Sequence, residues 1–214
     1  MAVIHRTTLS PTKLELLTTW LPTRPWYRGG EGKPELSRSG GFRLDDPQGE
    51  VGIEFMVATD TSGAEPVAYF VPLTYRGAPL GGAEDALVGT SEHGVLGRRY
   101  AYDGCHDPVL VAQLFALLDG RAEAQAQSES DTPDPTITHS STAGPFGTVV
   151  ARVSDTPEGT DLSVTGATLH LNRVLRPAGE GDTLPEGATG HVSGPWRTPK
   201  DAEVRGLFAE LRTA

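Results

Sequence analysis

The chain has 214 residues, of which 37% are hydrophobic and 21% are charged, and its formal net charge is −10. This length is enough for one full core, or for two small ones, without covalent staples. Neither lysine nor arginine forms a run. Because phosphate backbones are bound by clustered cations, the composition excludes nucleic acid as a partner, and the acidic charge mainly indicates solubility.

The cysteine content and the hydropathy indicate the compartment. Cys105 is the only cysteine, so an internal disulfide and a thiolate cluster for zinc or iron–sulfur are both excluded. Residues 1–17 contain no apolar core of secretory length, and no apolar run reaches the ~20 residues that span a bilayer. We therefore expect a cytoplasmic protein with no membrane partner and no cofactor.

A strand and a helix are predicted at the start of the chain. Residues 2–9 alternate between two faces, as a strand does. A helix then begins either at Ser10 with Pro11 or at the capping-box pair Thr12 and Glu15. The apolar face of this helix is formed by Leu14, Leu16, Leu17, Trp20 and Leu21.

An antiparallel meander follows. Residues 41–44 and 51–58 flank the sequence DDPQGE, whose residue types form tight connections, so the pattern predicts a hairpin. Residues 67–75 alternate with the two-residue period of another strand. Because Pro72 cannot donate to a ladder, we place this strand at a sheet edge, or its second half beyond the regular pairing.

The segment after this strand is predicted to be partly helical. Glu84 and Asp85 suit a helix start. Gly89 and Gly94 each cost roughly 1 kcal/mol inside a helix, so we expect two short helical turns rather than one helix. A strand is then expected at 98–102.

A more regular helix is predicted from Pro108 onward. Asp107 is a capping residue, and Pro108 occupies the first helical position. The apolar face of this helix consists of Val111, Leu114, Phe115 and Leu118. The first 120 residues are therefore interpreted as one α+β domain.

The rest of the chain is divided at a polar segment. Residues 121–143 have Ile137 as their only large apolar side chain, so we interpret them as a linker or flexible loop. Residues 144–214 form a β-rich extension, which we expect to pack against or extend the first sheet. Its predicted elements are strands at 146–153, 160–164 and 168–175 and a helix at 199–211, where Val204, Leu207, Phe208 and Leu211 have helical spacing.

The loop at 22–30 contains candidate binding residues, because the adjacent aromatics Trp26 and Tyr27 precede Arg28. Aromatic faces accept sugar C–H groups or cations, and guanidinium groups make forked hydrogen bonds, so the loop can form a platform for a sugar or a partner. The alternative is that Trp26 fills the core, as large aromatics usually do. The binding surface predicted from these residue types consists of Trp26, Tyr27, Arg28, Tyr75 and Arg76.

No catalytic residue and no metal site is predicted. Cys105, His106 and Asp107 are consecutive, but adjacent side chains of an extended chain point to opposite faces and are poorly placed to share a proton. Glu92 and His93 would need a distant partner to hold a metal, since the six histidines show no paired spacing. The carboxylates considered for acid–base chemistry are Glu84, Asp85 and Glu92, which also suit an ordinary helix start. The chain contains no phosphate loop and no HExxH or GxSxG motif.

Three stretches resemble a known family. They are AVIHRTTLSPTKLELLTTWLPTRPWY, DDPQGEVGIEF and VPLTYRGAPLGGAEDALVGTSEHGVLGRRYAYDGCHDPV. Over about residues 1–120 the sequence resembles the N-terminal cap domain of actinobacterial maltokinases, and closely resembles short free-standing proteins with a cap-like domain. The resemblance implies an α+β fold with a curved antiparallel sheet, packed helices and a cystatin-like topology, here extended by a few strands and a C-terminal helix.

The sequence departs from the full kinases, which make maltose 1-phosphate from maltose and ATP. It has no HxDxxxxN catalytic loop and no later metal-binding aspartate segment, so neither the base nor the magnesium ligands of phosphoryl transfer can be placed. Residues 169–177 faintly resemble the intermediate-subdomain strand that carries the ATP-contacting lysine, but Asn172 and Arg173 stand there. Residues 144–214 are therefore either a degenerate kinase subdomain or an unrelated extension.

Two functions remain open. The first is a non-catalytic cap-like protein, a regulatory or scaffolding partner of a kinase or glucan-metabolising enzyme in α-glucan, glycogen, maltose and trehalose metabolism. The second is a small-molecule binding protein that takes a sugar or sugar phosphate at the aromatic loop. A small enzyme built on Glu92, His93 or Cys105 is the least supported of the hypotheses.

Overall fold

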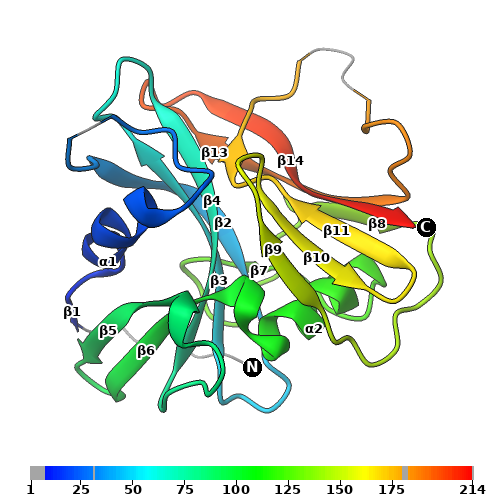
Figure 1. The fold of residues 1–214 in the computed structure, drawn as a ribbon, viewed down its shortest axis with the longest axis horizontal. Helices are drawn as coiled ribbons and strands as arrows, with labels where there is room; N and C mark the ends of the chain where they lie inside the picture. Colours follow the sequence, from blue (N-terminus) through cyan, green and yellow to red (C-terminus); the bar gives the residue numbers. More distant parts are fainter. Residues whose placement is uncertain (1–7, 31, 180–182, 214) are drawn as a thin grey trace.

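The computed structural model describes residues 8–30, 32–179 and 183–213 (Figure 1). Its helical elements are α1 (Lys13–Trp20), α2 (Pro108–Leu118) and the 3₁₀ turns η1 (Leu21–Thr23), η2 (Glu84–Ala86) and η3 (Gly104–His106). Its strands are β1 (Leu9–Ser10), β2 (Leu36–Leu44), β3 (Gly52–Asp60), β4 (Val67–Arg76), β5 (Leu87–His93), β6 (Gly97–Asp103), β7 (Gln125–Ala126), β8 (Thr138–Ser141), β9 (Arg152–Asp155), β10 (Thr160–Val164), β11 (Ala167–Leu171), β12 (Val174–Leu175), β13 (Gly190–Arg197) and β14 (Glu203–Thr213).

The described part of the chain is a β-rich sandwich, so the predicted α+β class with packed helices is wrong. Fourteen strands pair antiparallel in one continuous sheet, whose main path runs β1-β5-β6-β4-β3-β2-β13-β14-β11-β10-β9. Only α1 and α2 are α-helices of the described residues, and neither exceeds eleven residues. The cystatin-like topology that the resemblance implies is not confirmed.

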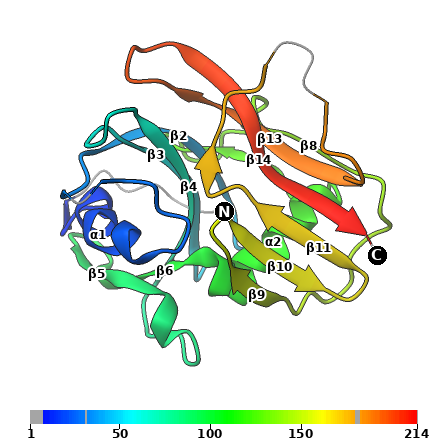
Figure 2. The same ribbon diagram turned by 45° about the horizontal axis from the view of Figure 1, so that its top comes forward.

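The central strands β3 and β4 are buried on both faces, because α1 lies on one side of them and the C-terminal strands lie on the other (Figure 2). One face packs against α1 and the loop that follows it, through residues such as Met56 and Tyr69. The other face packs against α2 and the C-terminal strands, with Phe55 and Phe70 in the larger core. Phe208 of β14 stacks on Phe70 with ring centroids 4.6 Å apart, so the C-terminal strands share this core with the N-terminal meander.

Two adjacent glycines of β2 lie where this strand meets its neighbours β13 and β3. The only residue pair between β13 and β2 is Trp196 with Gly40. Gly41 has φ +127°, and a Cβ there would lie 2.0 Å from the carbonyl oxygen of Phe55. A side chain at this position would therefore be strained both by the backbone conformation and by contact with the neighbouring strand.

Two of the helix starts predicted from sequence are confirmed, and the first of them is the Thr12 alternative rather than Ser10. Thr12 and Glu15 form the reciprocal capping box of α1. Asp107 caps α2 by accepting a hydrogen bond from Val109 N–H, and Pro108 occupies the first turn. The hairpin across DDPQGE is also confirmed, with strands longer than predicted. The strand predicted at 2–9 lies almost entirely outside the described residues.

The segment between β4 and β6 differs from the prediction. Only the first expected helical turn is present, as η2, and the second is replaced by β5. Gly89 of β5 has φ +157° and lies at a register shift opposite β6. The glycine that was interpreted as a helix breaker therefore marks a strand irregularity.

Strand β4 is central, so its predicted place at a sheet edge is wrong. On one side β4 pairs with β3 from Val67 to Tyr75. On the other side it pairs with β12 at Ala68 and Tyr69 and with β6 from Leu73 onward. Phe70 N–H donates to the carbonyl of Arg173, so two residues later the nitrogen of Pro72 faces the gap between these partners. A proline is tolerated there because no ladder bond is required.

The predicted C-terminal helix is wrong, because residues 203–213 form the longest strand, β14. This strand is paired on both sides, by β13 and β11. A bulge opposite Val192 and Ser193 leaves Phe208 as the extra residue. The bulge shifts the alternation of apolar and polar side chains along β14 by one residue. As a result, Val204, Phe208 and Leu211 have the four- and three-residue spacing that is typical of a helix face.

Residues 121–143, expected to be a linker or flexible loop, contribute strands to the sheet. Strand β7 pairs with β2, and β8 pairs with β13. Ile137 is buried in the larger core. The strand expected at 146–153 begins only at Arg152. In the described ranges, no helix combines the length and apolar character needed to cross a bilayer.

Candidate functional site

A pocket of about 340 Å³ opens between the loop after η1 and the C-terminal strands. Its volume is at the lower end of the range of small-molecule sites. The walls come from the loop after η1, the turn between β9 and β10, and the segment from β11 through β12, with one residue of β14. The lining residues are Arg28, Pro157, Glu158, His170, Asn172, Val174, Arg176 and Leu207.

Arg28 is held at the pocket by contacts at both ends. Its backbone N–H donates to the Tyr69 hydroxyl at 3.0 Å, and its Nη2 donates to the carbonyl of Pro157 at 2.7 Å. The preceding Tyr27 stacks on Tyr69 with ring centroids 5.6 Å apart and donates to Asp60. Burial raises the pKa of Tyr69 to about 12, so its hydroxyl stays protonated at neutral pH. The contacts of the aromatic loop therefore fix the backbone of Arg28, whose side chain is exposed.

The opposite wall carries further polar groups. His170 lies on β11, and its Nδ1 is 2.6 Å from Asp161 Oδ1, which fixes the orientation of the ring. Asn172 donates through its side-chain amide to the carbonyl of Leu207. Arg176 is exposed and follows β12 directly. The pocket therefore combines two guanidinium groups, an imidazole, an amide and the Glu158 carboxylate.

A buried ionic cluster lies where the two halves of the chain meet. Arg173 is completely buried, and its Nη2 donates to both oxygens of Asp103, at 2.8 and 2.6 Å. Its Nε donates to the hydroxyl of Thr160 at 2.7 Å. The guanidinium also lies over the ring of Trp26, 5.0 Å from the centroid. Arg173 therefore connects the loop after α1, the end of β6 and the start of β10.

The charge on Arg173 is maintained by its surroundings. Burial alone would lower the pKa of this guanidinium, but the charge of Asp103 and its hydrogen bonds raise the pKa above the ordinary value for arginine. Asp103 in turn accepts the backbone N–H of Cys105 as the cap of η3. The cluster is therefore a structural ion pair in which Arg173 Nη2 and Nε are hydrogen-bonded, while Nη1 has no hydrogen-bond partner in the described structure.

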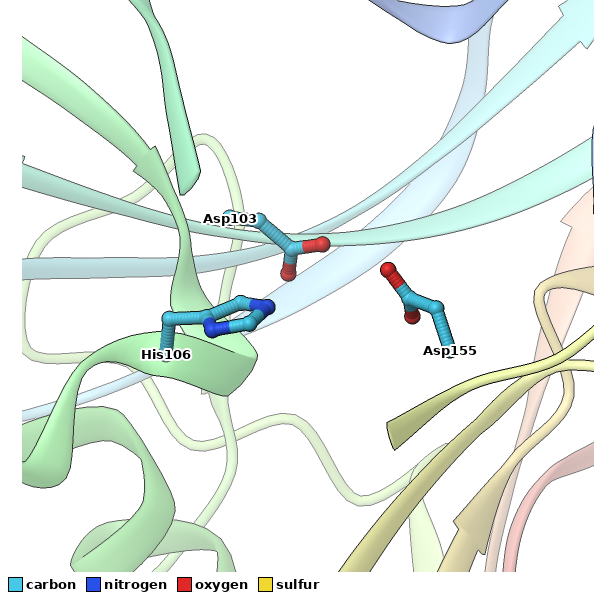
Figure 3. A group of neighbouring side chains, drawn as sticks. All are labelled: Asp103, His106 and Asp155. Carbon is cyan, nitrogen blue, oxygen red and sulfur yellow. The ribbon is translucent and has the colours of Figure 1, made fainter. Parts of the chain in front are cut away.

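Asp103, His106 and Asp155 converge beside this cluster, with potential ligand atoms within 4.8 Å of one another (Figure 3). His106 comes from η3 and Asp155 from β9. Both oxygens of Asp103 already accept from Arg173, so a cation there would compete with a fixed guanidinium. We assign the arrangement to the ion-pair network and not to metal binding.

The structure separates the predicted binding residues into two groups. Trp26 is fully buried and packs in the smaller core, in keeping with the interpretation of this residue as a core plug. Tyr27 is partly buried and Arg28 is exposed, both beside the pocket. Tyr75 and Arg76 lie at the far end of β4, six or more residues from Tyr69, which corresponds to ~20 Å along a strand.

Tyr75 and Arg76 already have intramolecular partners. The Tyr75 hydroxyl donates to Glu54 at 2.7 Å. Arg76 donates to both oxygens of Asp107, at 2.6 and 2.7 Å. These contacts tie β4 to β3 and to the start of α2. A binding role for these two residues stays a prediction.

The residues considered for catalysis have structural partners as well. Cys105 is buried, and burial raises the pKa of its thiol well above the usual value. Asp107 is engaged by Arg76 and by the cap of α2. Glu92 pairs with Arg98, and Nδ1 of His93 accepts the N–H groups of Val95 and Leu96 in the hairpin turn. No pair among them forms a nucleophile-and-base arrangement in the described structure.

Sequence reasoning missed most of the pocket. His170 and Arg176 were 142 or more positions from Arg28, and nothing in the residue spacing indicated that β11 and β12 return to the aromatic loop. Arg173 was noted only as the residue in place of a lysine. A basic residue surrounded by apolar alternation, in Leu-His-Leu-Asn-Arg-Val-Leu, was the available signal that a buried ion pair existed.

The fold and site define a β-rich sandwich protein in which the loop after η1 and the C-terminal strands form a pocket. Residues 20–107, which run from the end of α1 to the cap of α2, match the family model of the maltokinase N-terminal cap domain. The resemblance to a cap-like domain is therefore confirmed over this region, which is less than half of the chain. No curated protein matches the chain.

Proposed function

We propose that the protein is a non-catalytic cap-like protein of the cytoplasm that acts as a regulatory or scaffolding partner of a kinase or glucan-metabolising enzyme in α-glucan, maltose or trehalose metabolism. The observation that carries this proposal is the match of residues 20–107 to the maltokinase N-terminal cap domain. The 214 residues contain no HxDxxxxN loop. Among the residues considered for catalysis, Asp107 and Glu92 are held in ion pairs and Cys105 is buried. These observations support a role that depends on contacts with a partner.

The contact surface that we propose is centred on Tyr27 and Arg28. Arg28 is exposed, and its backbone is fixed by Tyr69, so little entropy is lost when its guanidinium pairs with a partner carboxylate. Tyr27 is partly exposed beside Arg28. Arginine and tyrosine are the residue types that commonly dominate the binding energy of interfaces.

Capture with cross-linking tests this proposal. The full chain would be immobilised and incubated with a lysate of its source organism, and cross-linked proteins would be identified by mass spectrometry. We expect enzymes of α-glucan, maltose or trehalose metabolism to be enriched over a column of the variant Arg28→Glu, which reverses the exposed charge. Arg38→Glu is the matched control, because Arg38 is an exposed arginine of β2 outside this surface.

Two results would count against the proposal. One is equal recovery of such enzymes by the wild-type and Arg28→Glu columns, which would show that the contact surface is not centred on Arg28. The other is the absence of any enzyme of these pathways from the cross-linked fraction, which would remove the partner role itself.

A further inference from the structure

The pocket has a positive character that is unusual for this chain. The protein has 28 acidic and 18 basic residues, yet two arginines and a histidine line one cavity with a single carboxylate, Glu158. Arg28 enters from the N-terminal side and Arg176 from the C-terminal side. A cationic cavity in an acidic protein concentrates anions locally, because the low-dielectric walls focus the field.

The two guanidinium groups retain free donors. Arg28 uses one Nη2 bond to the carbonyl of Pro157 and makes no ion pair among the described residues. Arg176 has no hydrogen bond or ion pair to any residue that the structure describes. Lack of an ion pair is not distinctive by itself, since the exposed Arg152 has none among the described residues either. Arg28 and Arg176 differ from Arg152 because both line the same pocket, where their free donors can reach a ligand.

The other residues that line the pocket suit an uncharged part of a ligand that carries hydroxyl groups. Val174, Leu207 and Pro157 provide apolar surface, and the Glu158 carboxylate is an acceptor for hydroxyl groups. The Asn172 side-chain nitrogen is bonded to Leu207, so its carbonyl oxygen is oriented and remains available as an acceptor. Acceptors together with apolar faces are what hydroxylated small molecules require, whereas a purely inorganic anion would use the arginines alone.

We propose that this pocket binds a small hydroxylated phosphomonoester, with Arg28 and Arg176 on its phosphate and with Glu158 and Asn172 on its hydroxyl groups. A phosphate is favoured over a carboxylate by the number of arginines. One guanidinium fork satisfies the two oxygens of a carboxylate, whereas the three oxygens and the roughly −2 charge of a phosphomonoester can be shared between two forks. The volume of about 340 Å³ is suited to a ligand of monosaccharide size.

The ligand joins the two halves of the chain in this arrangement. Arg28 belongs to the region that matches the cap domain, while Arg176 and Asn172 belong to the C-terminal strands. Arg28 is shared with the proposed contact surface, whereas Arg176 belongs to the pocket alone, so a change at Arg176 tests this binding role separately from the partner enzyme.

Isothermal titration calorimetry with the full chain tests the inference at low ionic strength and pH 7.5. The probes are glucose 6-phosphate, glycerol 3-phosphate, inorganic phosphate, citrate and glucose. We expect saturable binding of at least one of the two phosphomonoesters, and affinity at least ~10-fold weaker for inorganic phosphate, citrate and glucose.

Two matched variants identify the site. Arg176→Gln removes an unpaired, exposed pocket charge and should weaken phosphomonoester binding ~10-fold or more without changing the thermal midpoint. Arg152→Gln makes the same change at an exposed arginine of β9 outside the pocket and should bind like wild type. Unchanged affinity of Arg176→Gln, no binding of either phosphomonoester, or equal affinity for citrate or glucose would each overturn the inference.

Discussion

Removal of the Arg173 guanidinium is the sharpest perturbation that the structure offers. In the variant Arg173→Met, the Asp103 carboxylate stays buried at 1% exposure and loses both donors from Arg173. Breaking a buried ion pair on one side costs about 3–5 kcal/mol, since the remaining charge is left uncompensated. Trp26 also loses its cation–π contact, which contributes ~1 kcal/mol.

These magnitudes predict a large change in stability. For a domain of this size each kcal/mol shifts the thermal midpoint by about 2–4 °C, so Arg173→Met should melt roughly 10 °C or more below wild type. Asp103→Asn alone leaves a buried guanidinium unpaired and should have a similar effect. The double variant removes both charges and should recover part of the loss, because no isolated buried charge remains.

Urea unfolding followed by circular dichroism measures the three variants and yields the coupling energy between the two positions. Controls should show that the native far-ultraviolet spectrum is retained. The reasoning would be refuted by single variants that lose less than ~1 kcal/mol, or by a double variant whose loss is the sum of the single losses.

Three further predictions concern other parts of the molecule. Burial alone would raise the pKa of the Glu54 carboxyl, but Lys13 and the hydrogen bonds from Tyr75 and Gln127 lower it below its ordinary value of 4.5. The ionised Glu54 carboxylate should therefore stabilise the fold above pH 4.5, and this contribution should be lost as the pH falls below that value. The stability of Glu54→Gln should decrease less steeply than that of wild type as the pH is lowered, and an identical pH dependence of the two proteins would contradict this. Gly41→Ala should lower the free energy of unfolding in urea by ~2 kcal/mol or more, and Gly49→Ala should lower it by less. Both glycines have a positive φ, but only a Cβ at Gly41 would lie against the backbone oxygen of a neighbouring strand. The Cys105 thiol should be inert to a thiol-specific dye in the native protein and react at once in denaturant; rapid native labelling would contradict its burial.

The elements predicted correctly from sequence are those with local signals. The capping box of α1, the Asp107-Pro108 start of α2 and the DDPQGE hairpin each depend on residues within a few positions of one another. Their geometry is fixed by short-range hydrogen bonds and preset backbone angles, so distant packing does not alter it.

The elements predicted wrongly depend on distant strands. The apolar spacing of β14 imitates a helix because of a bulge against β13, and β5 is a strand because β6 and β1 pair with it. Pro72 is tolerated in a central strand because, along the same edge of β4, the pairing with β12 ends before Pro72 and the pairing with β6 begins after it. The fold class was wrong for a similar reason, since the C-terminal strands pack on β3 and β4 through contacts between residues far apart in sequence, such as Phe208 with Phe70.

The candidate site was predictable only in part. Arg28 was identified by its aromatic neighbours, and the structure places it at the pocket. Its counterparts on β11 and after β12 come from more than 140 residues further along the chain, and no local pattern relates them to Arg28. Burial of Trp26 followed the general preference of its residue type, but its contact with Arg173 required the folded chain.

Phosphoryl transfer is the most direct test of the central claim that these residues form a cap-like protein without catalytic activity. Purified full chain would be incubated with magnesium, ATP and either maltose or trehalose, and phosphorus NMR would follow the nucleotide and any sugar phosphate. The account predicts that the spectrum stays that of ATP at every protein concentration. A sugar phosphate signal that grows in proportion to the amount of protein would contradict it.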